Sequence, residues 1–202
     1  GVRLVGRDGE VQPARRYFPT PFNVFLMKTG LSRFFPGVRL IDPDDWDAFV
    51  SGPCDWVPGC YYLMPRSVVD RLGLFDPRFF LYYEEVDHCR RVRQAGLVVH
   101  YYADTTVVHI GGESARSDSS ITAAGRQIPA LQVESELLYM RKHYGLPGVL
   151  GLLALSSLGD AWLAFKSILR GRELAGAALH WRHVATMFSL FWRTACATRP
   201  TR

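Results

Sequence analysis

Two adjacent carboxylates, Glu84 and Glu85, with a third at Asp87, are the side chains of this sequence best suited to proton transfer. A carboxylate can act as a general base that takes the proton from an attacking hydroxyl group. Neighbouring side chains at a helix start point in different directions, so one can face a cleft while the other meets solvent. Asp87 can help to place a substrate or pair with Arg91, four residues on. The alternative for all three is a solvated acidic helix cap.

A helix beginning near Glu84 is expected to position these groups, because acidic residues favour the first turn of a helix. Gly96 is the expected stop. The apolar residues that recur at helical spacing are Val86, Cys89 and Val92.

His109 is a candidate metal ligand 24 residues after Glu85. The segments 97–102 and 105–110 read as one or two strands. His109 would end this region, and the glycines at 111–112 would let the backbone turn sharply toward a ligand. A neutral imidazole can bind Mn²⁺ or a similar ion beside carboxylates. The alternative is a structural histidine at a strand end.

Several short segments together resemble family 2 glycosyltransferases, in particular the rhamnosyltransferase-like members, in their order and spacing. These segments are Asp55–Cys60, Gly73–Phe80, Tyr83–Asp87, Gly96 and Val107–Gly112. The resemblance covers roughly residues 1–145. It implies an α/β fold, namely the acceptor-side half of a GT-A type glycosyltransferase (residues 1–127), followed by C-terminal helices that form a membrane-associated tail (128–202).

The resemblance also implies roles for individual residues. Glu85 takes the position of the family's catalytic base, which is usually Asp, and Glu84 and Asp87 lie beside it. His109 would join an Asp-x-Asp pair in holding a divalent cation, Mn²⁺ or Mg²⁺. Trp56 with Gly59 could form a wall of the sugar pocket, since an aromatic face packs on a pyranose and Gly admits close approach. A core Trp is the equal alternative.

The implied reaction is an inverting transfer of a sugar, with rhamnose as one candidate, from a nucleoside-diphosphate donor. The acceptor would be a glycan or polyprenyl-linked molecule in cell-surface polysaccharide synthesis. The family's N-terminal donor half, which ends in Asp-x-Asp, is not found in these residues. Asp42-Pro43-Asp44 has the letters of an Asp-x-Asp motif, but it belongs to an acidic turn rather than to a strand end. We therefore expect a fragment that is inactive by itself.

The remaining elements are predicted from local signals. Residues 1–35 read as an extended, loop-rich segment, because their prolines forbid a long helix. Residues 54–64 suit a buried strand. Ser67 with Asp70 resembles a capping box that starts a helix ending at Gly73. A further helix should end at Gly145. The apolar stripe of that helix is Val133, Leu137, Met140 and Tyr144.

Charge is concentrated in the tail. Residues 1–145 carry 17 Lys and Arg against 17 Asp and Glu, whereas residues 146–202 carry 7 against 2. A basic, apolar tail on a neutral body favours an anionic membrane surface over nucleic acid as partner. Together with four cysteines that lack paired short spacing, this predicts a cytoplasmic protein, peripheral to the inner face of the cell membrane.

The tail could meet the membrane in more than one way. Residues 146–165 approach the length that spans a bilayer, but Asp160 at the centre of a span would be costly. The last helix either lies in the interface or packs on the body. Its apolar stripe is Leu174, Ala178, Trp181, Ala185, Phe188 and Trp192. A non-catalytic membrane-binding module is the alternative function, and a zinc-binding domain using His100, His109 and cysteines is a third.

Overall fold

The computed structural model describes four stretches of the chain, residues 1–42, 46–110, 127–169 and 174–202. The fold is mixed α/β and divides into two compact units, each of two segments. The first unit comprises Gly1–Phe18 and Ile41–Ile128, and the second comprises Pro19–Leu40 and Pro129–Arg202. The predicted α/β class is confirmed at this level. The GT-A type and the functional division at 127/128 stay predictions.

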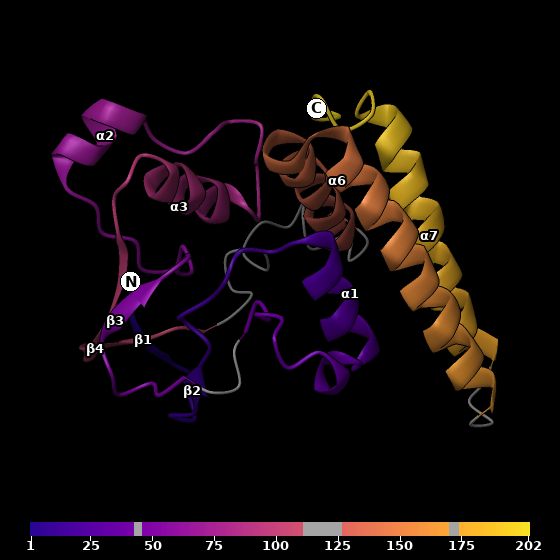
Figure 1. Ribbon diagram of the computed structural model, residues 1–202, viewed down its shortest axis with the longest axis horizontal. Coiled ribbons are helices and arrows are strands. Elements are labelled where there is room, and N and C mark those ends of the chain that lie inside the picture. Colours follow the sequence, from indigo (N-terminus) through magenta and orange to yellow (C-terminus); the bar gives the residue numbers. More distant parts are fainter. Residues whose placement is uncertain (43–45, 111–126, 170–173) are drawn as a thin grey trace. The chain divides into compact units, whose positions relative to one another are not determined.

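The first unit is built on a four-stranded sheet in the order β2-β1-β4-β3 (Figure 1). The central strands, β1 (Val2–Val5) and β4 (Val99–Val108), are parallel. The edge strands, β2 (Val11–Gln12) and β3 (Gly52–Cys54), pair with them antiparallel. The region predicted as one or two strands is one strand, which places His109 immediately after its last residue.

Two helices accompany this sheet. Helix α2 spans Arg66–Leu72 and helix α3 spans Glu84–Gln94, so both predicted helices form. The predicted stop at Gly73 is confirmed by its positive φ of 73°. The predicted capping box is wrong, because Pro65 is the N-cap residue and no side chain caps the helix. Ser67 therefore lies inside the first turn rather than before it.

The predicted strand over residues 54–64 is also wrong beyond its first residue. Strand β3 ends at Cys54, and the chain then forms only an isolated bridge between Trp56 and Arg16. Pro58 and Gly59 follow within five residues, and a proline cannot donate to a sheet ladder. Of the aromatic and β-branched residues that suggested a strand, Trp56 and Val57 are buried without further strand pairing.

The expectation of a loop-rich segment over residues 1–35 was incorrect, since it holds β1, β2 and helix α1 (Pro21–Thr29). Pro21 starts the helix rather than preventing it, because the first helical N–H has no partner within a helix anyway. Thr20 and Asn23 form a reciprocal capping box. Gly30, with φ 71°, ends the helix in the left-handed conformation.

Helices form the second unit. Helix α6 covers Gln127–Leu169, with a break at Gly145 (φ 68°, ψ −166°), where the sequence predicts a helix end. Helix α7 covers Leu174–Arg193 and lies alongside α6 (Figure 1). Both are packed with α1 around a buried apolar core. Its members include Leu26, Leu137, Met140, Val149, Leu152, Met187 and Leu190.

Among the helices of the described residues, one, Ala130–Leu169, is long and apolar enough to cross a membrane, with 44% of its most apolar window buried. Core helices of soluble proteins meet the same criterion, so this is weak evidence for membrane association. Asp160, the charge that argues against spanning, is buried inside the protein and paired with Lys28 at 2.7 Å.

Helix α7 does not pack through the apolar stripe that the sequence suggests. Its buried residues include Met187, Leu190 and Phe191, whereas Trp181 and Trp192 on the predicted stripe are exposed. The helix therefore has two apolar faces, and only one of them is covered within the described residues.

Candidate active site

The acidic pair stands at a conformationally restrained helix start. Tyr82 and Tyr83 both have φ of 68°, a region that non-glycine residues seldom adopt. Tyr83 is the N-cap of α3, and its carbonyl accepts a hydrogen bond from the amide of Asp87 at 2.9 Å. Glu84 and Glu85 are thus the first two residues of the helix. Unusual backbone of this kind concentrates at functional sites.

Glu85 is the most perturbed carboxylate at this site. Burial raises its pKa to about 7, and the neighbouring charge of Glu84 adds to the rise. Backbone groups of Glu85, Gly59 and Val86 oppose the shift but do not cancel it. A general base works best when its pKa lies near the working pH. Glu85 therefore has the acidity that proton transfer near neutral pH requires.

Gly59 lies directly against Glu85. A Cβ built on Gly59 would be 3.7 Å from the Cβ of Glu85 and 3.8 Å from its carboxyl carbon. The structure thus brings together two of the predicted site residues, one from the loop after β3 and one from α3. A larger side chain at residue 59 would extend over the carboxylate.

Glu84 has a milder environment. Burial raises its pKa as well, while its own backbone amide lowers it. The Oε2 atoms of Glu84 and Glu85 are both buried and accept no hydrogen bond from the described part of the chain. Two unsatisfied carboxylate oxygens at one helix start are expensive in a purely structural site. They are consistent with a site that accepts a proton.

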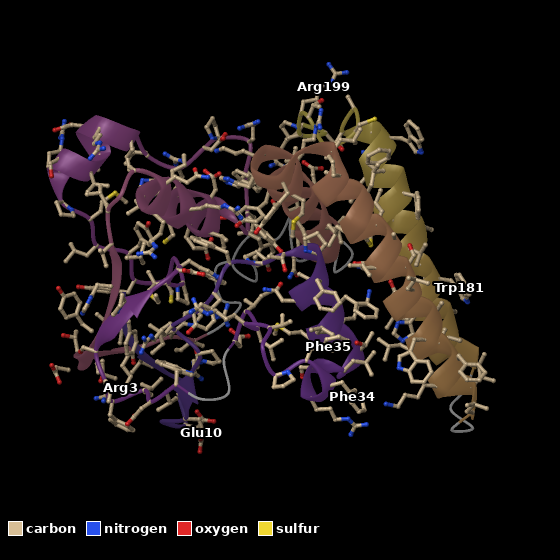
Figure 2. The ribbon with its side chains drawn as sticks, viewed as in Figure 1. Arg3, Glu10, Phe34, Phe35, Trp181 and Arg199 are labelled. Atoms are coloured by element: carbon tan, nitrogen blue, oxygen red, sulfur yellow. The ribbon has the colours of Figure 1, made fainter. Side chains whose placement is uncertain are left out.

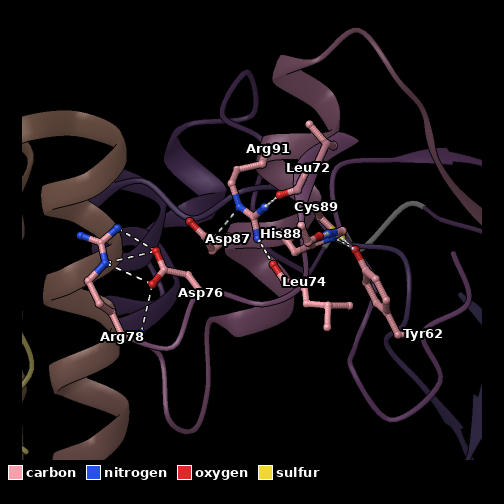
Figure 3. Close-up of polar contacts among 10 residues, drawn as sticks. Tyr62, Leu72, Leu74, Asp76, Arg78, Asp87, His88, Cys89 and Arg91 are labelled. Carbon is pink, nitrogen blue, oxygen red and sulfur yellow. Dashed lines mark hydrogen bonds and ion pairs between the residues drawn. The ribbon is translucent and has the colours of Figure 1, made fainter. Parts of the chain in front are cut away.

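Asp87 is paired with Arg91 (Figure 3). It is fully buried, and its Oδ2 atom accepts a hydrogen bond from Nε of Arg91 at 3.0 Å. The two Nη groups of Arg91 donate to the carbonyls of Leu72 and Leu74, at 2.6 and 2.7 Å. Of the two roles considered for Asp87, the structure displays the pairing with Arg91. That pairing ties α3 to the end of α2.

A second set of polar contacts on α3, around His88, was not predicted from the sequence (Figure 3). His88 is buried, with Nε2 3.1 Å from the carbonyl of Gly73 and Nδ1 2.8 Å from the hydroxyl of Tyr62. Because a carbonyl can only accept, Nε2 carries the proton and Nδ1 accepts from Tyr62. The Tyr62 oxygen also lies 3.2 Å from Sγ of Cys89. These contacts hold His88 in one neutral form.

Trp56 is buried in the first unit. Its indole N–H donates to the carbonyl of Tyr17 at 2.8 Å, and the guanidinium of Arg16 lies 4.9 Å from the ring centroid. This is the arrangement expected of a core Trp, the alternative that the sequence left open. A role for Trp56 as a wall of a sugar pocket stays a prediction.

His109 is oriented by Gln12. Nδ1 of His109 lies 2.8 Å from Oε1 of Gln12, while Nε2 of Gln12 donates to the His109 carbonyl at 3.1 Å. The bond from Nε2 of Gln12 to the His109 carbonyl shows that the amide oxygen of Gln12 faces the ring. Since an amide oxygen can only accept, Nδ1 of His109 must be the donor. Nε2 of the neutral ring is then an unprotonated nitrogen, the form that binds metals.

The described residues do not by themselves complete a metal site. No group of three or more His, Cys, Asp or Glu side chains within residues 1–42, 46–110, 127–169 and 174–202 is arranged to hold a metal ion. His109 fits the role of one ligand, and the acidic pair on α3 does not join it in a ready-made cluster. The glycines after His109 lie outside the described residues.

Comparison with known proteins finds relatives over part of the chain. No family model matches the chain, and no solved structure does. Part of the chain is 35% identical over 123 residues to N-acetylglucosaminyl-diphospho-decaprenol L-rhamnosyltransferase of Mycobacterium tuberculosis, covering 55% of this chain and 36% of that protein. The same match is found in strain H37Rv. Rhamnosyltransferase WbbL of Escherichia coli is 33% identical over 63 residues, covering 31% of this chain and 24% of that protein.

These relatives support a glycosyltransferase function in broad terms. The matched region spans only about a third of the length of the mycobacterial relatives and about a quarter of the length of WbbL. The activity, substrates and partners of the whole protein are therefore matters for proposal.

Proposed function

We propose that this chain is part of a family 2 glycosyltransferase in which Glu85 is the general base for an inverting sugar transfer. The observation that carries the proposal is a buried carboxylate at the start of α3, with a pKa of about 7 and an oxygen that accepts no hydrogen bond from the described residues. A structural helix cap would not need a carboxylate whose pKa is raised to about 7.

The proposed step moves one proton and exchanges one bond. The Glu85 carboxylate takes the proton of an acceptor hydroxyl group as its oxygen attacks the anomeric carbon of the donor. The bond from that carbon to the diphosphate breaks, and the nucleoside diphosphate leaves from the opposite face, which inverts the configuration. Glu85 then loses its proton to solvent. Burial keeps the pKa of Glu85 high, and the negative charge of Glu84 adds to the rise by repulsion.

The substrates follow from the relatives rather than from the described geometry. The relatives are rhamnosyltransferases by name, so rhamnose, carried by a nucleoside diphosphate, is the sugar to test first. The acceptor proposed is a glycan or polyprenyl-linked molecule, and the place of action is the cytoplasmic face of the cell membrane.

A divalent cation, Mn²⁺ or Mg²⁺, would neutralise charge on the departing diphosphate. His109 fits as one of its ligands through Nε2, because Gln12 already engages Nδ1. The other ligands would come from outside the described residues.

Replacement of Glu85 by Gln tests the proposal in the whole protein, including any residues that precede this sequence. Gln keeps the size of the side chain but cannot accept the proton, so the turnover rate should fall by about 10²–10⁴-fold with little change in donor affinity. Transfer would be followed with radiolabelled dTDP-rhamnose and an N-acetylglucosamine-terminated acceptor.

Glu10→Gln is the matched control, since Glu10 is exposed in the turn between β1 and β2 (Figure 2). It should transfer sugar at the normal rate. A Glu85→Gln enzyme with near-normal turnover would exclude Glu85 as the base. If lipid binding persists while no transfer occurs in any form of the protein, the alternative of a non-catalytic membrane-binding module is correct.

A further inference from the structure

The end of the helical pair formed by α6 and α7 exposes an unusual amount of apolar surface. We call residues 158–169 of α6 and 178–182 of α7 the hairpin end. Seven of its large apolar side chains are exposed, by 46–69%, and Leu163 is half-buried. The seven are Leu158, Trp162, Phe165, Ile168, Leu169, Leu179 and Trp181. Contiguous apolar surface of this kind on a soluble protein marks an interaction site.

The helices that carry these exposed side chains also have a side that packs against the protein. A Cβ built on Gly159 would lie 3.3 Å from Cγ2 of Thr29 on α1, so α6 and α1 are in close contact there. Ala164 and Ala177 are buried. Each helix thus has a buried side, marked by Ala164 on α6 and Ala177 on α7, and an outward side that carries the large apolar residues. Figure 2 shows Trp181 projecting outward from α7.

A buried ion cluster fixes the two helices to each other and to α1. The Oδ2 atom of Asp160 lies 2.7 Å from Nζ of Lys28, and Nδ1 of His183 lies 2.7 Å from the same oxygen. Nδ1 of His180 is 3.1 Å from Oδ1. The only carboxylate described on the hairpin end is therefore turned inward and paired, and contributes no negative charge to its surface.

The exposed charge of the hairpin end is positive. Lys166 is half-buried and Arg182 is exposed, and neither forms an ion pair with any described residue. Exposed tryptophans beside unpaired cations suit the headgroup region of a bilayer, where the rings meet the acyl boundary and the cations meet lipid phosphates.

We propose that the hairpin end inserts into the surface of a bilayer that contains anionic lipid. This inference rests on the membrane attachment suggested under the proposed function, and it names the residues that make the contact. The hairpin end does not span the bilayer, because insertion to the centre would carry the Lys28–Asp160 pair and the packed α1 helix into hydrocarbon. Contact is limited to the outward apolar side chains.

Sedimentation with phosphatidylglycerol-containing vesicles tests the proposal. Trp162→Ser together with Trp181→Ser should weaken vesicle binding by at least about tenfold, because both interface anchors are lost. Lys166→Gln together with Arg182→Gln should weaken binding at low salt by about fivefold per charge, with a smaller effect at high salt. Neither pair should alter the thermal unfolding temperature much, since all four residues lie at the surface.

Trp192→Ser is the matched control. Trp192 is 70% exposed on the same helix, eleven residues beyond Trp181, or roughly 16 Å along the axis. It should bind vesicles like the unchanged protein. Equal losses from Trp192 and Trp181 would show that the whole outer face of α7 lies in the interface, and would overturn the assignment to the hairpin end. Unchanged binding of the Trp162/Trp181 double variant would overturn it as well.

Two further outcomes separate this inference from its alternatives. If the Trp162/Trp181 variant converts a dimer to a monomer without changing vesicle binding, a second copy of the chain covers the hairpin end and the proposal is wrong. Sugar transfer to a water-soluble acceptor should be unchanged in these variants. Glu85→Gln should lose sugar transfer and bind vesicles normally. The Trp162/Trp181 variant should transfer sugar normally and lose vesicle binding. These two results together would establish the two functions separately.

Discussion

Asp87 and Arg91 form an ion pair one helical turn apart on α3, with Nε of Arg91 3.0 Å from Oδ2 of Asp87. Asp87 is fully buried, and this ion pair is one of the interactions that stabilise its charge. Arg91 also donates to the carbonyls of Leu72 and Leu74 and thereby joins α3 to α2. The pair lies beside the candidate base yet holds the helix in place.

Removal of one partner of this pair should destabilise the protein more than removal of both. Arg91→Met alone removes the ion pair of the buried Asp87 with Arg91, together with the hydrogen bonds to the carbonyls of Leu72 and Leu74, and should cost about 3–5 kcal/mol of unfolding free energy. The double variant Asp87→Leu/Arg91→Met should lose less than the sum of the single variants, as measured by urea unfolding. If Asp87→Asn instead abolishes sugar transfer at unchanged stability, Asp87 acts in catalysis, as the resemblance to glycosyltransferases implies.

The raised pKa of Glu85 predicts a pH-dependent stability. The unfolded chain ionises this group near 4.5, whereas the folded chain ionises it near 7. Between these values the unfolded state holds fewer protons, so stability falls as pH rises through this window and levels off above about 7. Glu85→Gln removes this loss. It should raise the unfolding free energy by roughly 2–3 kcal/mol at pH 8.

The same variant should have almost no effect at pH 4, where Glu85 is neutral in both states. Urea unfolding of the chain and of Glu85→Gln at the two pH values measures the difference. Glu10→Gln, at an exposed position, should show no such pH dependence. An equal effect of Glu85→Gln at both pH values would mean that burial does not shift the Glu85 pKa.

His109 and Gln12 supply a third prediction, on metal binding in the whole protein. His109→Ala should raise the Mn²⁺ concentration needed for donor binding, and excess Mn²⁺ should restore much of the activity, because one ligand of several is lost. Gln12→Leu removes the acceptor that fixes Nδ1 as the donor, so it should cause a smaller rise in the same direction. Titration of donor binding with Mn²⁺ measures both. An activity of His109→Ala that excess metal cannot restore would point to a role outside metal binding.

The sequence predicts elements well where the signal is local. The stop signal at Gly96 and the spacing of Val86, Cys89 and Val92 indicate α3, and all three of these apolar residues are buried. Likewise Gly145 breaks α6 where a helix end is expected. These features depend on a few neighbouring residues and on backbone conformation, which the chain carries wherever it folds.

The site contacts that the sequence could not predict link distant positions. The Tyr62 hydroxyl is hydrogen-bonded to Nδ1 of His88, 26 residues away in the sequence, and no motif around either residue predicts this contact. The orientation of α7 was ambiguous for a related reason. Both Trp181 and Met187 lie on apolar faces at helical spacing, and only packing against α1 and α6 determines that Met187 is the buried one. Periodicity identifies apolar faces but does not say which one is covered.

The last prediction concerns Asp160, the charged residue that argued against a membrane-spanning helix. Its side chain is buried inside the second unit. Burial opposes ionisation of Asp160, but hydrogen bonds from Lys28, His183 and His180 outweigh it and lower its pKa below the ordinary value of 3.8. A lowered pKa means that its ionised form stabilises the fold above about pH 4, and that this contribution is lost as pH falls through the folded-state pKa.

Asp160→Asn should therefore destabilise the chain at pH 7, by an amount on the order of 3 kcal/mol, since Lys28 is left without its buried counter-charge. The difference from the unchanged chain should narrow as pH falls below about 4, because Asp160 of the unchanged chain then becomes neutral, first in the unfolded and then in the folded state. Lys28→Met together with Asp160→Leu is the compensated control and should be more stable at pH 7 than Asp160→Asn alone. Thermal unfolding followed by circular dichroism at pH 7 and pH 3 measures these differences. A constant difference between Asp160→Asn and the unchanged chain at both pH values would show that Asp160 contributes by packing and hydrogen bonding rather than by its charge.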